Sequence, residues 1–256
     1  MSVWHGDYRF LLRNLIVKDF KIRYRNMSLG VLWSLLNPLI MLAVYLFVFT
    51  RIFKPANVPH YALYILSGMI TFNFFSLAWM TGTSSLLDNA GLIKRVPVPR
   101  EIVPIASVLS NGLHLAIQMA LLLIAVVATG LGVNIYWFWL PLIWAVGIIF
   151  IFGISLITAG LNVYLRDTRY IVESACLVAF WFTPIFYLAS FVPAEYRSLY
   201  SMFPITALMM AMRSVLLDGQ APAAGLMFKF LVISLATLGL GVVLFRQMKS
   251  RFYDYL

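Results

Sequence analysis

Four long stretches without a charged residue constrain the fold of this chain more than any other feature. The stretches 26–50, 55–87, 102–165 and 174–194 contain no Asp, Glu, Lys or Arg. An α-helix rises about 1.5 Å per residue and needs about 20 apolar residues to cross the hydrocarbon core of a bilayer. Each stretch reaches that length, so the sequence predicts an all-α polytopic membrane protein.

The composition supports this class and excludes others. Hydrophobic residues make up 62% of the chain and charged residues 11%, against roughly 45–50% and about 25% in soluble domains. The single cysteine, Cys176, excludes a disulfide framework and a multi-cysteine metal site. No Gly-Lys dipeptide occurs, so no phosphate-binding loop for ATP is present. No removable signal peptide is expected, because the first 25 residues carry six basic residues and two aspartates.

Six transmembrane helices can be placed. The 64 residues of the stretch 102–165 would make a helix of about 96 Å, so this stretch must hold two spans. Gly130, Gly132 and Asn134 favour a turn between them. The expected spans are about 30–53, 61–86, 104–129, 137–164, 171–189 and 226–245. An even number of spans puts both termini on one side.

The basic residues orient the spans. The chain has 19 Lys and Arg residues and a formal net charge of +10. With both termini in the cytoplasm, 14 of these 19 bases fall in cytoplasmic segments, as the positive-inside rule requires. Membrane topology thereby explains the charge, and no nucleic-acid partner is expected.

The segment 7–25 is too charged to span, yet its apolar residues recur at helical spacing. This pattern is typical of an amphipathic helix in the cytoplasmic interface. The alternative is a helix that only anchors the topology. The basic residues expected to face anionic lipid headgroups or a protein partner are Arg9, Arg13 and Lys21.

The segment 190–224 is apolar, but only 15 uncharged residues separate Arg197 from Arg213, which is too few to cross. A pair of short re-entrant helices in the outer leaflet fits better than a solvated loop. Its part 190–216 would form either an outer gate or a passive outer cap. The expected gate residues are Met202, Phe203, Met209 and Arg213.

The loop 88–101 follows the second span on the cytoplasmic side. Asp88 can cap a short helix, and Pro97 and Pro99 can end it. Exposed apolar and basic residues would suit docking to a cytoplasmic partner, and a structured turn fits equally well. The candidate coupling residues are Asp88, Leu92, Ile93, Lys94, Arg95 and Arg100.

Several short motifs follow one another along almost the whole chain. They are RYR at 23–25, SLGVLW at 28–33, NP at 37–38, NAGLIKRVPVPREIVP at 89–104, LNVYLRDTRY at 161–170, TPIFY at 183–187 and FRQMKSRF at 245–252. In this order they resemble the ABC-2 type polysaccharide-export permeases, the membrane subunits of O-antigen, capsule and teichoic-acid exporters. One departure is VPVP at 96–99, where the family often has an aromatic residue before a single proline.

The resemblance implies an architecture, partners and a cargo. The chain would be a single transmembrane domain, 1–256, that works as a homodimer in the bacterial inner membrane. Two copies of a separate ABC ATPase would bind ATP and Mg, and the chain itself would bind no cofactor. The cargo would be a lipid-linked polysaccharide carried outward. The segment 7–25 would be the interface helix, 88–101 the coupling loop and 190–216 the gate helices.

We also expect an aromatic-lined channel along the dimer axis, built from spans one and five. Aromatic rings stack on the C–H faces of sugars, and Tyr and Trp add a polar group. Packing between helices, or an interfacial belt, is the alternative explanation of these residues. The expected channel residues are Tyr45, Phe49, Trp181 and Tyr187.

Three other functions compete with this interpretation. An ion-coupled transporter needs ionisable groups within the membrane. The spans offer few, His114 in the third and Glu173 at the cytoplasmic end of the fifth, and we expect a hydrogen-bonded packing role for His114. A membrane enzyme needs convergent catalytic groups, but His5, His60 and His114 fall at different levels of the topology. No catalytic or metal site is therefore expected. The closest competitor is an ABC-2 permease for a small lipid or drug.

Overall fold

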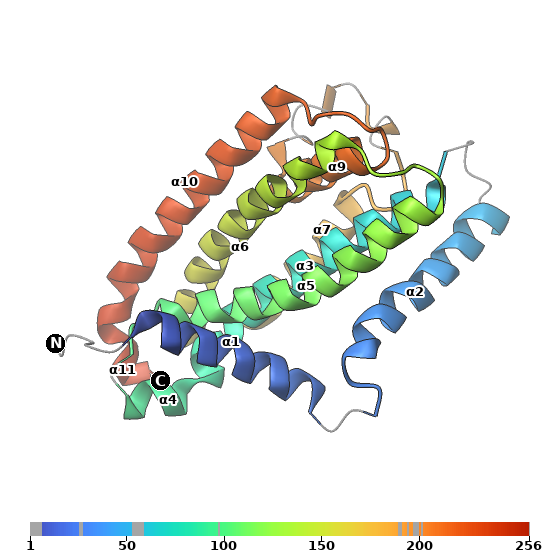
Figure 1. The fold of residues 1–256 in the computed structure, drawn as a ribbon. Helices are drawn as coiled ribbons and strands as arrows, with labels where there is room; N and C mark the ends of the chain where they lie inside the picture. Colours follow the sequence, from blue (N-terminus) through green and yellow to red (C-terminus); the bar gives the residue numbers. More distant parts are fainter. Residues whose placement is uncertain are drawn as a thin grey trace.

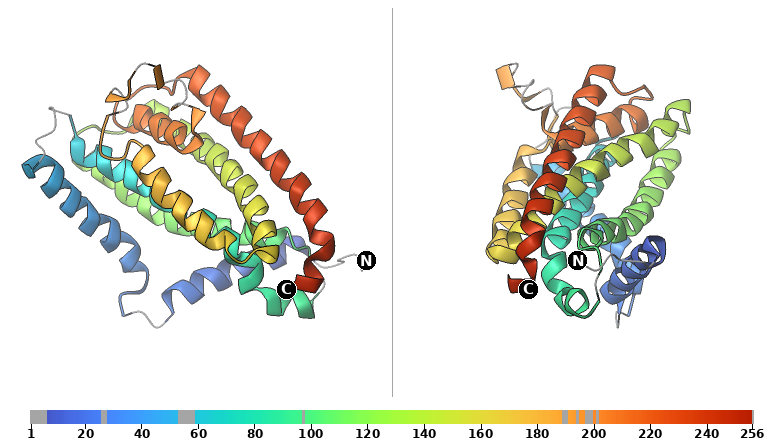
Figure 2. Two further views of the ribbon diagram at one scale, coloured as in Figure 1. Left: turned by 180° about the vertical axis from the view of Figure 1, so that it is seen from behind. Right: turned by 90° about the vertical axis from the view of Figure 1, so that its left-hand side faces the viewer.

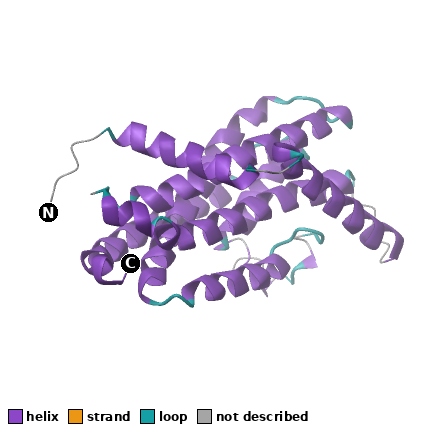
Figure 3. Cartoon of the chain, turned by 90° about the horizontal axis from the view of Figure 1, so that it is seen from below, coloured by secondary structure: helices purple, strands orange, loops and turns teal. Residues whose placement is uncertain are grey.

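The computed structural model describes residues 7–25, 28–52, 59–96, 98–188, 191–193, 195–196, 200 and 202–255. Within these ranges every regular element is a helix, as the view in Figure 3 shows. The predicted all-α class is confirmed. Pro97, which was expected to help end the short helix of the 88–101 loop, lies outside the described residues.

The long helices run side by side in one bundle (Figure 1). The first half of the chain contains α1 (Tyr8–Tyr24), α2 (Trp33–Leu46), α3 (Tyr61–Asp88), α4 (Ala90–Arg95) and α5 (Ile102–Ala128). The second half contains α6 (Trp139–Tyr164), α7 (Thr168–Phe182), α9 (Pro204–Leu216), α10 (Ala224–Met248) and α11 (Phe252–Tyr255). The start of α1 and the helix α11 lie with α4 at one end of the bundle, and α9 lies toward the other end.

Among the residues that the structure describes, five helical segments are long and apolar enough to cross a membrane. They are Gly30–Phe49, Tyr61–Asp88, Ile102–Ala128, Ile135–Tyr164 and Ala224–Met248. These segments coincide with five of the six expected spans. The remaining one, expected at 171–189, corresponds to α7, which has 15 residues and a length of about 22 Å. Because the hydrocarbon core is about 30 Å thick, the count of six spans stays a prediction.

The spans differ strongly in how much of their surface the chain itself covers. In the most apolar window of α3, 67% of residues are buried, whereas the corresponding value for the span containing α2 is 11%. The central helix α3 packs against α5, α6, α7 and α9. The helices α2 and α10 form opposite flanks of the bundle (Figures 1 and 2). The outer face of α2 is thus left for lipid or for a second subunit.

A close glycine contact joins α6 to α10. A Cβ atom added to Gly241 would lie 2.5 Å from the carbonyl oxygen of Gly153, and one added to Gly153 would lie 2.6 Å from the backbone of α10. Small residues allow such close backbone approach between membrane helices. Gly239 lies two residues away on α10, and a Cβ atom there would meet nothing within 4 Å.

We expect Gly241→Ala to lower the melting temperature of the purified chain by about 4–8 °C, because the added methyl forces two backbones apart at a cost of about 2 kcal/mol. Gly239→Ala adds the same methyl to the same helix without a clash, so it should leave the melting temperature within about 2 °C of the wild type. Thermal unfolding in detergent measures both. Equal shifts in the two variants would contradict the packing argument.

Candidate transport pathway and coupling surfaces

An aromatic cluster joins α2 to the chain that follows α7. The ring centroid of Phe186 lies 5.0 Å from that of Tyr45 and 5.2 Å from that of Phe49, with the latter rings stacked at 6°. The same ring lies 5.3 Å from Phe180 and 6.1 Å from Trp181. The fold thus brings together the two segments from which the channel residues were predicted.

Phe186 holds the centre of this cluster, although the sequence does not single it out among the aromatic residues of span five. It belongs to the TPIFY motif at 183–187, where the helix has ended and Pro184 redirects the chain. Its side chain is buried, whereas Tyr45 and Phe49 are half-buried against it. The position of the motif just after α7 is the signal that marks this residue.

The other two predicted channel residues lie at the edge of the cluster. Trp181 is 68% exposed. Tyr187 is half-buried, and its hydroxyl donates to the carbonyl oxygen of Phe182 at 3.0 Å and contacts the hydroxyl of Tyr200. A hollow of about 410 Å³ lies beside them, lined by Trp181, Phe182, Tyr187, Phe191, Val192, Pro193 and Tyr200. An exposed indole and tyrosine hydroxyls can offer a sugar both a stacking face and hydrogen bonds.

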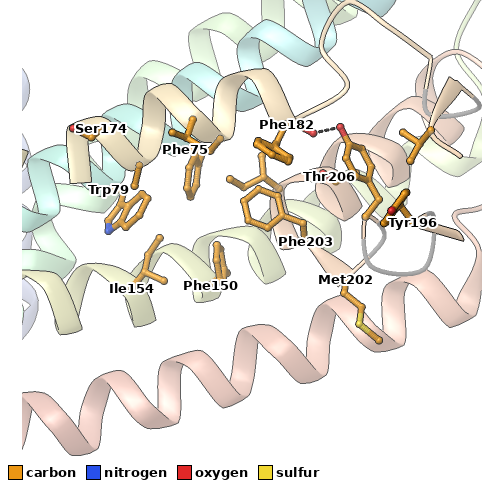
Figure 4. Close-up of a pocket in the computed structure, with 16 residues that line it drawn as sticks. Phe75, Trp79, Phe150, Ile154, Ser174, Phe182, Tyr196, Met202, Phe203 and Thr206 are labelled. Atoms are coloured by element: carbon orange, nitrogen blue, oxygen red, sulfur yellow. Dashed lines mark hydrogen bonds between the residues drawn. The ribbon is translucent and has the colours of Figure 1, made fainter. Parts of the chain in front are cut away.

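A larger cavity of about 920 Å³ lies between α3, α6, α7 and the segment leading into α9 (Figure 4). Its labelled lining residues are mainly aromatic or aliphatic: Phe75, Trp79, Phe150, Ile154, Ser174, Phe182, Tyr196, Met202, Phe203 and Thr206. Met202 and Phe203, two of the predicted gate residues, are 46% and 39% exposed and line this cavity. Their role in a gate stays a prediction.

The other two predicted gate residues lie inside the protein. Met209 is fully buried and Arg213 is 5% exposed. Both belong to α9, which packs against α3, α6 and α10. Both side chains are enclosed within the bundle, and their role in a gate stays a prediction. Residues 190, 194, 197–199 and 201 of the expected gate segment lie outside the described residues.

Arg213 crosslinks three segments through neutral oxygen atoms. Its guanidinium donates to the carbonyl oxygens of Tyr64 at 2.8 Å, Pro184 at 2.6 Å and Ile185 at 3.2 Å. It also donates to the hydroxyl of Ser67 at 3.3 Å. The guanidinium lies 3.5 Å from the ring centroid of Tyr64, which adds a cation–π contact. Arg213 therefore ties α9 to α3 and to the chain after α7.

At the end of the bundle away from α9, the loop 88–101 contains the short helix α4, but Asp88 does not cap that helix. Asp88 is the last residue of α3, and its carboxylate accepts a hydrogen bond from the Ser84 hydroxyl at 2.7 Å. The residue before α4 is Asn89, whose side chain accepts a hydrogen bond from Lys18 of α1. The capping prediction is wrong, because α3 continues through Asp88 and engages its carboxylate.

Ile93 is only 4% exposed, in an apolar cluster at this end of the bundle. The other buried members of this Ile93 cluster are Leu15, Leu86, Val98, Val103, Ala106, Leu156, Ala159, Val163, Phe245 and Phe252. The prediction that Ile93 inserts into a partner is wrong, because its own chain already encloses it. Leu92 is half-buried against the same cluster, whereas Lys94 and Arg95 are exposed.

Polar contacts fix the loop to the C-terminal segment. The Nζ atom of Lys249 lies 2.5 Å from a carboxylate oxygen of Glu101, and Arg100 donates to the carbonyl oxygen of Lys249. The guanidinium of Arg100 lies 5.8 Å from the ring centroid of Phe252. Burial raises the pKa of the Glu101 carboxyl, but the hydrogen bond from Lys249 and the charges of Lys249 and Arg246 outweigh burial and hold the pKa below its usual value. These contacts hold the loop 88–101 against the C-terminal segment.

The predicted amphipathic helix is present as α1. Leu15 on its apolar face belongs to the Ile93 cluster, and the Tyr24 hydroxyl lies 2.6 Å from Nδ1 of His114 on α5. His114 thus has the expected hydrogen-bonded packing role. The basic residues predicted to face outward are all exposed: Arg9, Arg13 and Lys21.

These features define a multi-pass helical membrane protein. It has long apolar helices, an aromatic surface and a polar end that carries basic residues. Among the described residues, no three His, Cys, Asp or Glu side chains gather where they could hold a metal ion. The chain belongs to the ABC-2 type transporter family, whose model matches residues 11–217. It is accordingly the membrane component of an ABC transporter, which works with a partner ATPase.

Several curated proteins resemble the chain over nearly its whole length. The O-antigen export system permease protein RfbA of Klebsiella pneumoniae is 28% identical over 241 residues, which cover 93% of this chain and 92% of that protein. The protein of the same name from Myxococcus xanthus is 27% identical over 250 residues, covering 97% and 96%. The polysialic acid transport protein KpsM of Escherichia coli is 23% identical over 238 residues, covering 91% of each.

Proposed function

We propose that this chain is the permease subunit of a bacterial exporter that moves a lipid-linked polysaccharide of the O-antigen type from the cytoplasm across the inner membrane. Its relatives are named for O-antigen export and polysialic acid transport. The observation that carries the proposal is the aromatic cluster where α2 meets the end of α7, with Trp181 projecting from it at 68% exposure.

The working unit would be a homodimer in which α2 and α7 of two copies face each other. The span containing α2 is the least buried of the five spans. Phe47, next to α2, is 63% exposed, and Trp181 and Phe182 on α7 are 68% and 64% exposed. A second copy would cover these residues and leave an aromatic-lined path between the subunits, through Tyr45, Phe49, Trp181 and Tyr187.

Such a path suits a polymer that has to slide. Aromatic rings stack on the C–H faces of successive sugars, while tyrosine hydroxyls and the indole N–H meet the hydroxyl edges. Each contact is weak and tolerates many sugars. A deep polar pocket would instead hold one repeat unit in a single position and oppose movement.

ATP and Mg would be bound by two copies of a cytoplasmic ATPase at the end that carries α1 and α4. The exposed bases Lys94 and Arg95 would meet acidic residues of that ATPase, and the same end, with both termini, would lie in the cytoplasm. Because the loop 88–101 that contains α4 is fixed to α1 through Asn89 and Lys18 and to the C-terminal segment through Arg100, its displacement would move the spans as a unit.

Export by the reconstituted complex tests this proposal. The full chain, co-purified with its ATPase in proteoliposomes, would be given ATP and a lipid-linked O-antigen, capsule or teichoic-acid glycan. Transport and ATPase stimulation by one of these glycans supports the proposal and identifies the cargo. Stimulation by small lipids or drugs alone would instead favour the competing ABC-2 permease function.

The aromatic path makes a separate prediction. We expect Tyr45→Ala combined with Trp181→Ala to reduce polymer export at least about fivefold, because two stacking surfaces worth about 0.5–1.5 kcal/mol each are removed. A matched pair is Phe138→Ala with Phe228→Ala, since these rings are 66% and 69% exposed and lie outside the cluster. Export should survive in the matched pair, and both proteins should retain the ATPase. Equal losses of export would place the path elsewhere.

A further inference from the structure

A second large cavity, of about 1100 Å³, lies at the end of the bundle that carries α4. It is bounded by the start of α1, by α4, α5, α6 and α10, by the residues between α4 and α5, and by the turn after α10. Its ionisable lining residues are Lys94, Arg95, Arg100, Glu101, Arg246 and Lys249. The apolar part of its wall includes Ile105, Phe152, Leu156, Leu238 and Val242. Neither the aromatic path nor the hydrolysis of ATP by a partner accounts for this cavity.

Basic residues predominate among the charged residues that line the cavity. Of the described lining residues, five are bases and one is an acid. The acid, Glu101, is paired with Lys249 at 2.5 Å. An anionic group would therefore be attracted to this end of the cavity, and a cationic one repelled.

The cavity also extends from the polar end of the bundle into its apolar part. Along α10 its wall runs from Lys249 back to Leu238, eleven residues, which corresponds to about 16 Å of helix. Phe152 and Leu156 of α6 face the same space. An acidic partner protein in the cytosol would account for the bases alone. A molecule with an anionic head and apolar chains would account for both parts.

The position of the cavity separates its occupant from the exported cargo. Its wall includes α10, and α10 and α2 form opposite flanks of the bundle (Figure 1). The aromatic cluster belongs to the α2 side. An occupant beside α10 therefore lies off the proposed path and in reach of the surrounding membrane.

We propose that this cavity binds one anionic phospholipid of the membrane, with its phosphate near Arg246 and its acyl chains along Leu238 and Val242. Anionic headgroups are drawn to basic residues at the cytoplasmic surface. Because Lys94 and Arg95 of α4 line the same cavity as α10, the bound lipid would bridge the coupling loop to that span. The inference goes beyond the proposed export function and does not depend on the identity of the cargo.

Native mass spectrometry of the full-length chain, titrated with phosphatidylglycerol or phosphatidylcholine, tests the proposal. We expect one phosphatidylglycerol per chain to bind at least about tenfold more tightly than phosphatidylcholine. Arg246→Gln should weaken phosphatidylglycerol binding at least about fivefold, and Arg246→Lys should restore most of it. Val242→Trp should weaken binding through the apolar part, without a change of charge.

The matched control is Arg169→Gln, which removes an exposed base near the same end that does not line the cavity. This variant should bind phosphatidylglycerol like the wild type. Equal affinity for the two lipids, or an equal loss in Arg169→Gln, would overturn the proposal. Displacement of phosphatidylglycerol by millimolar inorganic phosphate would overturn it too, since it would indicate a simple anion site. If Arg246→Gln aggregates, the two-lipid comparison on the wild type and on Arg169→Gln still decides.

Discussion

Replacing Arg213 with methionine should leave little folded protein in the membrane. The new side chain has similar length, but it removes the donors to the carbonyl oxygens of Pro184 and Ile185 and one of the two side-chain donors to that of Tyr64, which still accepts from the Ser67 hydroxyl. Each buried polar group left unsatisfied costs about 1–3 kcal/mol, so the loss should reach several kcal/mol. Native proteins are stable by only about 5–15 kcal/mol. The amount of chain in membranes and its thermal unfolding in detergent measure the effect.

Two further variants test the position of the Arg213 side chain in a different way, one by changing its hydrogen-bond donors and one by crowding it. Arg213→Lys keeps the charge and some donors, so its stability should be intermediate. Gly68→Ala leaves Arg213 in place but puts a methyl 2.6 Å from its Nη2 atom, so it should also destabilise the protein. An exposed arginine, Arg166, supplies the control, and Arg166→Met should be neutral. A stable Arg213→Met protein would show that α9 is held by apolar packing alone.

The second large effect is expected at Ile93. An aspartate at this position would bury a carboxylate in the Ile93 cluster, where Ile93 is 4% exposed. An unpaired buried charge costs several kcal/mol even after the surrounding structure relaxes. Ile93→Asp should therefore prevent stable folding, which protease resistance and melting temperature of the purified chain would measure.

An aspartate at position 95, two residues later, should have a different effect. Arg95 is exposed, so Arg95→Asp should fold normally and change only the charge of α4. Because rim charges mainly govern how fast and how strongly partners associate, we expect co-purification of the ATPase to fall by about tenfold or less. Normal folding of Ile93→Asp, or misfolding of Arg95→Asp, would contradict the assignment of one residue to the core and the other to the docking surface.

The features that the sequence predicted correctly depend on local pattern. Hydropathy and the absence of charge over 20 or more residues locate the spans, because a helix in a bilayer has to satisfy its own backbone and expose apolar side chains. Helical periodicity in the same way predicts α1, with Leu15 inward and Arg9 outward. Gly130 and Gly132, both with positive φ, mark the turn between α5 and α6. None of these inferences requires knowledge of which helices meet.

The predictions that were wrong concern residues whose role depends on which other side chains they contact. Leu92 and Ile93 are adjacent apolar residues of one short helix, and only the packing of α4 on α1 and α3 makes Ile93 the buried one. Asp88 was expected to cap α4, but α3 continues far enough to engage its carboxylate.

Arg213 and Phe186 show the same limit at the other end of the molecule. An arginine near a proposed gate has the same local sequence whether it faces water or donates to Tyr64, 149 residues earlier in the chain. Phe186 becomes the centre of an aromatic cluster only because α2 reaches the end of α7. The sequence by itself determined a polytopic helical membrane protein with a basic end, since those properties are sums over local residues. The tertiary structure alone decided which residues fasten the bundle and which remain on its surface, because burial and hydrogen bonding depend on partners far apart in the chain.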